Sequence, residues 1–124
     1  MISTLLLAAI LTPAPIVQAP PPPIPKNPTL IEFSCPDHDR DDQHELKILQ
    51  VTGTNRVTIT TILLGDPPLD TDGMVRTTIN VQPIAFGQYV ATVNSIAGTE
   101  KSDPSDESNQ FERVPGRPSK LGIK

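Results

Sequence analysis

Aromatic residues are scarce in this chain, which contains no tryptophan, one tyrosine and three phenylalanines. A hydrophobic core must therefore be built from Ile, Leu, Val and Thr, and such residues favour strands over helices. Cysteine is scarcer still, because Cys35 stands alone and excludes an internal disulfide. A chain of 124 residues suits one domain, and packing must stabilise it.

Blocks of basic residues are also absent, and the formal net charge is −4 at pH 7. Without a basic patch or an array of exposed aromatic side chains, the chain lacks a surface suited to nucleic acid. Catalytic signatures are missing as well: the sequence has no Gly-x-Ser-x-Gly elbow and no cluster of glycines ahead of a helix. We therefore expect a protein that is not an enzyme, carries no cofactor and binds no nucleic acid.

Residues 1–19 contain an uncharged apolar run, Leu5–Leu11, followed by a small-residue sequence that ends at Ala19. This pattern predicts a signal peptide or an apolar N-terminal segment, and hence a secreted, periplasmic or virion-surface protein. No Lys or Arg precedes the run and Pro20 directly follows Ala19, so an uncleaved anchor and an ordinary apolar tail remain alternatives. The run is short for a membrane span of ~20 residues.

Residues 20–28 are dominated by proline. Consecutive prolines fix φ and remove backbone donors, so the segment is predicted to be a polyproline II linker that spaces the following domain from its anchor. A ligand for a proline-binding groove is the alternative.

From residue 29 onward, apolar and polar residues alternate with the period of strands, and helical periodicity is nowhere sustained. Strands are predicted over residues 29–35, 45–51, 56–64, 74–82, 89–94 and 109–114. Turns are predicted at Gly53–Asn55 and at Asp72-Gly73. Leu46 and Ile48 are expected to face inward, and Cys35 should share the inner face of its strand with Ile31 and Phe33.

Ile84, Gly87 and Tyr89 form an apolar-x-x-Gly-x-Tyr corner at the start of a predicted strand, with the Tyr89 hydroxyl expected to bond nearby backbone. Residues 29–114 thereby resemble a fibronectin type III domain, in which a tyrosine corner opens a strand that leads through a Gly/Ser-rich loop to the last strand. The resemblance implies an antiparallel Greek-key β-sandwich of about seven strands. Phe33 stands where that family usually has a tryptophan.

Three groups of residues could carry chemistry. Asp37, Asp39 and Asp41 place oxygen ligands at alternate positions, as a calcium loop does, but Asp42 stands where such a loop needs glycine. Cys35, His38 and His44 are three candidate zinc ligands without a fourth, and Cys35 with either histidine is a formal nucleophile pair. Asp66, Asp70 and Asp72 are a further oxygen cluster, explained equally well as turn residues.

For Cys35 we expect a structural role, as a slowly reacting core thiol with no cationic neighbour on its strand face.

The function predicted from these features is non-catalytic: a binding or spacer module at a cell or virion surface that contacts protein or carbohydrate. The alternative is a small metal-binding protein or metal-dependent hydrolase that uses the region from Cys35 to Glu45. Residues 115–124 form a C-terminal linker in which Leu121 and Ile123 are expected to supply a missing edge strand. They would do so by folding back, or by pairing with a neighbouring copy in self-association. A frayed polar tail is the third reading of this segment.

Overall fold

The computed structural model describes residues 20–40 and 43–124, and these residues form an all-β structure. In order along the chain, the strands are β1 (Leu30–Ser34), β2 (Gln43–Thr52), β3 (Asn55–Gly65), β4 (Met74–Thr78), β5 (Gly87–Ala97), β6 (Glu100–Lys101) and β7 (Phe111–Arg113). Within the described ranges the helical structure is limited to a short 3-10 turn, His38–Arg40. The named strands all pair antiparallel, so the all-β antiparallel expectation is confirmed.

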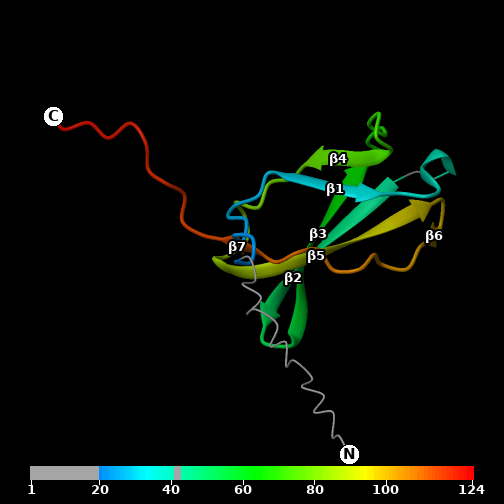
Figure 1. Cartoon of the computed structure of the whole chain (residues 1–124), viewed down its shortest axis with the longest axis horizontal. Helices are drawn as coiled ribbons and strands as arrows, with labels where there is room; N and C mark the ends of the chain where they lie inside the picture. The colour runs from blue at the N-terminus through cyan, green and yellow to red at the C-terminus, as the bar shows by residue number, and fades with distance from the viewer. Residues whose placement is uncertain (1–19, 41–42) are drawn as a thin grey trace, which may run out of the picture.

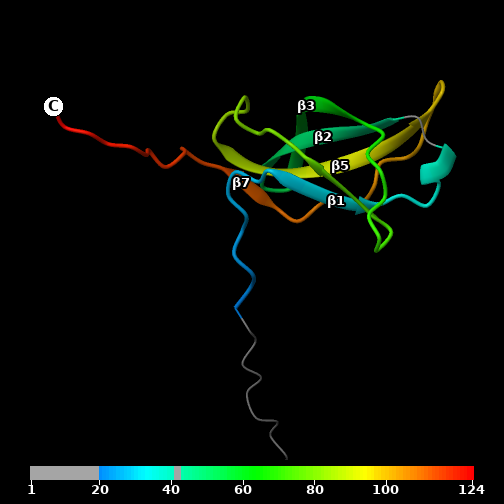
Figure 2. The ribbon, with the colours of Figure 1, turned by 90° about the horizontal axis from the view of Figure 1, so that it is seen from above.

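The strands form two sheets that lie face to face (Figures 1 and 2). One contains β1 and β4, and the other has the order β3-β2-β5, with both β6 and β7 pairing with β5. Ile31 of β1 packs against a buried cluster to which β2 and β5 contribute. The hydrophobic core therefore lies between the two sheets.

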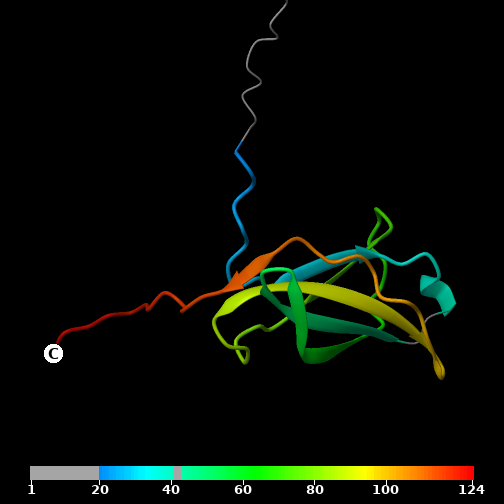
Figure 3. The same ribbon diagram turned by 90° about the horizontal axis from the view of Figure 1, so that it is seen from below.

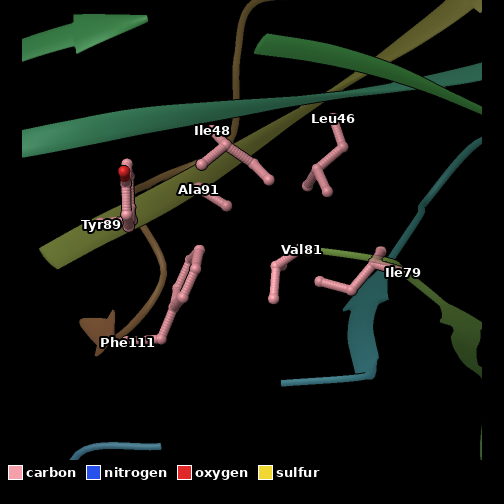
Figure 4. Packing of buried hydrophobic residues seen from close by; sticks show 7 residues of the cluster. All are labelled: Leu46, Ile48, Ile79, Val81, Tyr89, Ala91 and Phe111. Atoms are coloured by element: carbon pink, nitrogen blue, oxygen red, sulfur yellow. The ribbon is translucent and has the colours of Figure 1, made fainter. Parts of the chain in front are cut away.

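Seven buried side chains make up this core (Figure 4): Leu46, Ile48, Ile79, Val81, Tyr89, Ala91 and Phe111. Leu46 and Ile48 are 3% and 0% exposed, which confirms that they face inward. Tyr89 stacks on Phe111 with 5.8 Å between ring centroids, so the two aromatic members of the otherwise aliphatic cluster lie side by side.

The tyrosine corner forms at the start of β5. The Tyr89 hydroxyl donates a hydrogen bond of 2.6 Å to the carbonyl of Ala85, four residues upstream, which confirms the expected backbone contact. Gly87 opens the strand, and half-buried Ile84 packs against the core cluster. The loop that enters β5 is thereby tied to the strand by one fully buried side chain.

Both predicted turns are present. Gly53 has φ +60°, a left-handed conformation that glycine adopts without steric cost, and it joins β2 to β3 in a long hairpin (Figure 1). At the second turn, the Asp72 carboxylate accepts a 3.1 Å hydrogen bond from the backbone N–H of Met74, where β4 begins.

Arg76 of β4 connects the two strands of the smaller sheet. Its guanidinium lies 3.0 Å from a carboxylate oxygen of Glu32 on β1, 2.8 Å from Asp70 and 2.6 Å from Asp72. The hydrogen bond from Arg76, with a second from the Met74 backbone, lowers the pKa of Asp72 to about 2. The pKa of Arg76 is raised by its hydrogen bonds to Asp72, Asp70 and Glu32.

A segment without regular strand structure, residues 102–110, closes one edge of the larger sheet, and we call it the serine strap. Its serines recur every third residue, while the residues they meet on β5 recur every second. Ser102, Ser105 and Ser108 each donate a backbone N–H to the carbonyl of Ser95, Val93 and Ala91 respectively. Each serine hydroxyl also accepts a bond from the N–H of the same β5 residue, at 2.9 to 3.0 Å.

Two strand predictions differ from the structure in detail. The strand predicted over 74–82 ends at Thr78, since the chain then turns with the Asn80 side chain accepting from the Gln82 N–H. The strand predicted over 89–94 extends from Gly87 to Ala97 as β5, and Val90 and Asn94 on its face opposite the core cluster are only 5% and 3% exposed. Asn94 is held there because its amide donates to the carbonyl of Ser102 on the strap.

The two ends of the described chain leave the body of the molecule. Residues 114–124 extend away from it without strand structure, as two views show (Figures 1 and 2), so the predicted folding back of Leu121 and Ile123 is wrong. Pro115 and Pro118 hold this stretch extended because their rings fix φ. Residues 1–19, where the signal sequence was predicted, lie outside the described ranges. Across those ranges no helix has the length and apolar character needed to span a membrane.

Candidate functional site

The structure places the candidate calcium ligands on an exposed turn. Asp37 and Asp39 are exposed beside the 3-10 turn, and Asp41 lies outside the described residues. Within residues 20–40 and 43–124, no group of three or more His, Cys, Asp or Glu side chains is arranged to hold a metal ion. The metal-dependent alternative therefore gains no support from the described side chains.

Cys35 and His44 do come together, although nine residues separate them in sequence. His44 Nε2 lies 3.3 Å from the Cys35 sulfur, and His44 Nδ1 lies 3.2 Å from the carbonyl oxygen of Gly65. A carbonyl only accepts, so Nδ1 must carry the proton, and Nε2 of the neutral ring is left facing the thiol as an acceptor. The sulfur also lies 3.5 Å from the Ser95 hydroxyl.

This contact gives Cys35 an imidazole neighbour that the alternation of its own strand did not predict. The thiol does share the inner face with Ile31 and Phe33 and is half-buried. The neighbour comes from β2, where fully buried His44 packs against the ring of Phe33 at 5.2 Å. Strand alternation within β1 could not reveal a side chain that arrives from the other sheet.

His38, the third candidate zinc ligand, is directed elsewhere. Its Nε2 lies 2.6 Å from the carbonyl oxygen of Pro67 and 3.4 Å from Asp66 Oδ1. The ring stacks on His44 at 6.0 Å between centroids. His38 thus fastens the loop after β1 to the loop after β3.

Two separate pockets lie along β1, and we call the pair the trough; Cys35 lines the first of them. Its first part, about 440 Å³, lies between the end of β1 and the serine strap, and its lining includes Phe33, Cys35, Ser102 and Ser105. The second part, about 220 Å³, lies between the start of β1 and the other end of the strap. Leu30, Ile31 and Ser108 are among its lining residues. Figure 3 shows β1 and the strap running along the same side of the molecule.

The floor of the second part of the trough is the hydrophobic core itself. Leu46, Ile48, Ala91 and Phe111 all line it, although each is buried. Above this floor, β1 pairs with β4 and, in the described chain, with no other strand. The trough therefore reaches down to buried core side chains beneath a strand edge whose outward N–H and C=O groups have no strand of the described chain opposite them.

Acidic residues line the trough. Asp37, Glu100 and Asp103 contribute to its first part and Glu32 to its second. The one basic lining residue, Lys101, is paired at 3.1 Å with Glu45. The site thus combines an apolar floor, a strand edge and a negative rim.

Sequence reasoning missed this trough because its two sides come from different sheets. The Ser-x-x-Ser-x-x-Ser spacing at residues 102–108 was the available signal for the strap, and the shortage of a strand before β1 was the signal for the unpaired edge. Neither a scan against models of known families nor searches of curated proteins and of solved structures found a match for this chain.

Proposed function

We propose that this chain is a non-catalytic binding module whose trough accepts an extended polypeptide segment. One observation carries the proposal: the free edge of β1 lies directly over the apolar floor formed by core residues. A strand edge offers alternating donors and acceptors to another backbone, and the floor offers pockets for alternate side chains. Of the two partner classes expected from the sequence, protein and carbohydrate, this combination favours protein.

The proposed scaffold is a Greek-key sandwich of the fibronectin type III kind. The pairing of β1 with β4, and of β2 with β3 and β5, supports it, because sandwiches of this class divide their strands between the sheets in that order. The Tyr89 bond to Ala85 at the entry to β5 supports it too, since this is where such domains place their tyrosine corner. In this interpretation no strand precedes β1 among the described residues, and the trough lies where such domains place one.

The proposed setting is a cell or virion surface. The apolar sequence of residues 1–19 would direct export, and the proline-rich residues 20–28 would act as a spacer. Within that spacer, Pro25 and Asn27 bond to the backbone of Glu112 on β7 at 2.9 and 2.8 Å. The spacer is therefore fixed to the domain at its inner end.

Selection from a displayed library of random octapeptides on the immobilised full chain tests the proposal. We expect enrichment of peptides with apolar residues at alternate positions and basic flanks, and loss of that enrichment on Leu30→Asp. Leu30 lines the trough and is 56% exposed, so the change should leave the core intact. Equal enrichment on both chains would reject the trough, and retention of glycans in place of peptides would reassign the partner to carbohydrate.

A further inference from the structure

The C-terminal tail, residues 115–124, has the properties that the trough requires of an occupant. It has no strand structure, Lys120 within it has a left-handed φ of +58°, and its Leu121 and Ile123 are 91% and 94% exposed. Residues two apart in an extended chain point to the same face, ~7 Å apart. The tail thus presents two aliphatic side chains on one face beside an unused backbone.

The charge of the tail is opposite to that of the rest of the chain. Arg117, Lys120 and Lys124 lie in it, and no Asp or Glu follows Glu112. With these three charges set aside, the formal charge of −4 becomes −7 for residues 1–116. The tail is therefore attracted to the negative rim that Asp37, Glu100 and Asp103 give the first part of the trough, whereas Glu32 beside the second part is paired with Arg76.

We propose that the trough of one copy of this chain binds the C-terminal tail of a second copy. The tail pairs along the free edge of β1 and inserts Leu121 and Ile123 over the apolar floor. The inference rests on the proposed function of the trough and names its partner.

The sizes agree. An apolar cavity of ~150 Å³ holds a six-carbon benzene, so the eight side-chain carbons of Leu and Ile need roughly 200 Å³. The apolar part of the trough measures about 220 Å³. β1 has five residues and the stretch from Ser119 to Lys124 has six, so a tail of this length covers the whole exposed edge.

The tail leaves β7 in a direction that does not lead to its own trough, so the tail that fills a trough must come from a second copy. The Val114 N–H bonds to the Asn27 side chain at 3.0 Å, and Arg113 bonds to the carbonyl of Val81 at 3.1 Å, so the start of the tail is fixed. Pro115 and Pro118 then carry the chain outward, away from its own trough (Figure 1). Tail-to-trough contact between copies is heterologous, so it builds an open head-to-tail chain of subunits.

Sedimentation velocity of the full chain over a range of concentrations tests this. The wild type should form species larger than a dimer, more readily at low salt, because the contact is partly ionic. The double variant Leu121→Asp/Ile123→Asp should stay monomeric, as should Leu30→Asp. Leu69→Asp is the matched control: it places a charge on an apolar side chain that is 42% exposed and does not line the trough, and it should assemble like the wild type.

Mixing the two monomeric variants provides the decisive measurement. The tail variant keeps an intact trough and Leu30→Asp keeps an intact tail, so one contact can form between them. The mixture should stop at a heterodimer. A wild type that is monomeric throughout, a tail variant that still assembles, or a mixture without heterodimer would each overturn the proposal.

A synthetic peptide of residues 117–124 covers the case in which Leu30→Asp does not fold. It should bind the tail variant, and a peptide with Asp at both apolar positions should bind at least about tenfold more weakly, because two buried apolar contacts are lost. If the two peptides bind equally, or if neither binds, the proposal that the tail of a second copy is the partner is wrong. If library peptides are nevertheless enriched on the trough, the proposed peptide-binding function is kept and only the self-association is rejected.

Discussion

At the scale of single residues, Tyr89 combines two kinds of stabilisation. Its ring is buried against Phe111 and Ile48, and its hydroxyl satisfies the Ala85 carbonyl. The hydroxyl is polar and the side chain is only 1% exposed, so the hydrogen bond offsets the cost of its burial.

Substitutions of Tyr89 separate the contribution of the buried ring from that of the hydroxyl hydrogen bond. Tyr89→Phe should lower the free energy of unfolding by ~1 kcal/mol through the lost hydrogen bond, and Tyr89→Ala by ~3 kcal/mol or more through the cavity. Denaturant titration of both variants measures the difference. Losses of equal size would mean that the hydroxyl contributes nothing beyond the ring.

Cys35 is the residue whose predicted behaviour changes most with the structure in hand. The sequence indicated a slow, purely structural thiol, whereas His44 lies 3.3 Å from its sulfur. An imidazole fixed by the Gly65 carbonyl can take the thiol proton and hold the resulting thiolate.

We therefore expect native Cys35 to react with iodoacetamide at pH 7 at least roughly tenfold faster than in His44→Gln, since a hydrogen bond to a charged group contributes ~1.5–3 kcal/mol. Labelling followed by mass spectrometry gives both rates. Ser95→Ala is a control that removes a neighbour of the sulfur without removing the base. If His44→Gln reacts as fast as the wild type, the histidine only orders the loops.

At the scale of elements, the edge strands of the two sheets differ in whether another segment covers them. The serine strap covers the β5 edge of the larger sheet with backbone and hydroxyl bonds, whereas β1 and β3 each have a strand on one side alone in the described chain. β3 carries exposed Val57, Ile59 and Leu63, but none of its residues lines the trough. The free β1 edge is the one that combines pairing groups with buried apolar surface.

The pairing of β1 with β4 should depend on pH through Arg76. The pKa of Asp72 is lowered to about 2, below its ordinary value of 3.8, because Arg76 hydrogen-bonds its charged form. Stabilisation by this contact is therefore complete above pH ~4 and is lost as the pH falls towards 2. Arg76→Gln should melt below the wild type at pH 6, and the gap should narrow between pH 4 and pH 2.

Calorimetry at several pH values measures the gap in melting temperature. Lys26→Gln removes a positive charge from an exposed side chain outside this cluster and shows the effect of net charge alone. A gap that stays constant from pH 6 to pH 2 would mean that the Arg76 bonds do not stabilise the fold.

At the scale of the whole molecule, the proposal combines a spacer, residues 20–28, with a trough that receives a segment and a C-terminal tail that fits it. The spacer is bonded to β7 through Pro25 and Asn27, and β7 leads directly into the tail. A copy bound through its trough thus presents a free tail to the next copy. Such an arrangement suits a surface protein that extends by addition of subunits.

The sequence by itself determined most of the strands, the two predicted turns and the inward positions of Leu46 and Ile48, but not the bounds of β4 and β5 or the short strand β6. The signals behind these predictions are local: strand alternation, the turns at Gly53 and Asp72-Gly73, and the Tyr89 corner. They act through local backbone geometry, which does not depend on how the strands later pack. Three contacts were decided by the tertiary structure alone. His44 lies beside Cys35, three serines hydrogen-bond the edge of β5, and β1 lies beside a pocket lined by core residues. These contacts join residues from different sheets or distant segments, so their distances depend on packing that no single stretch of sequence contains.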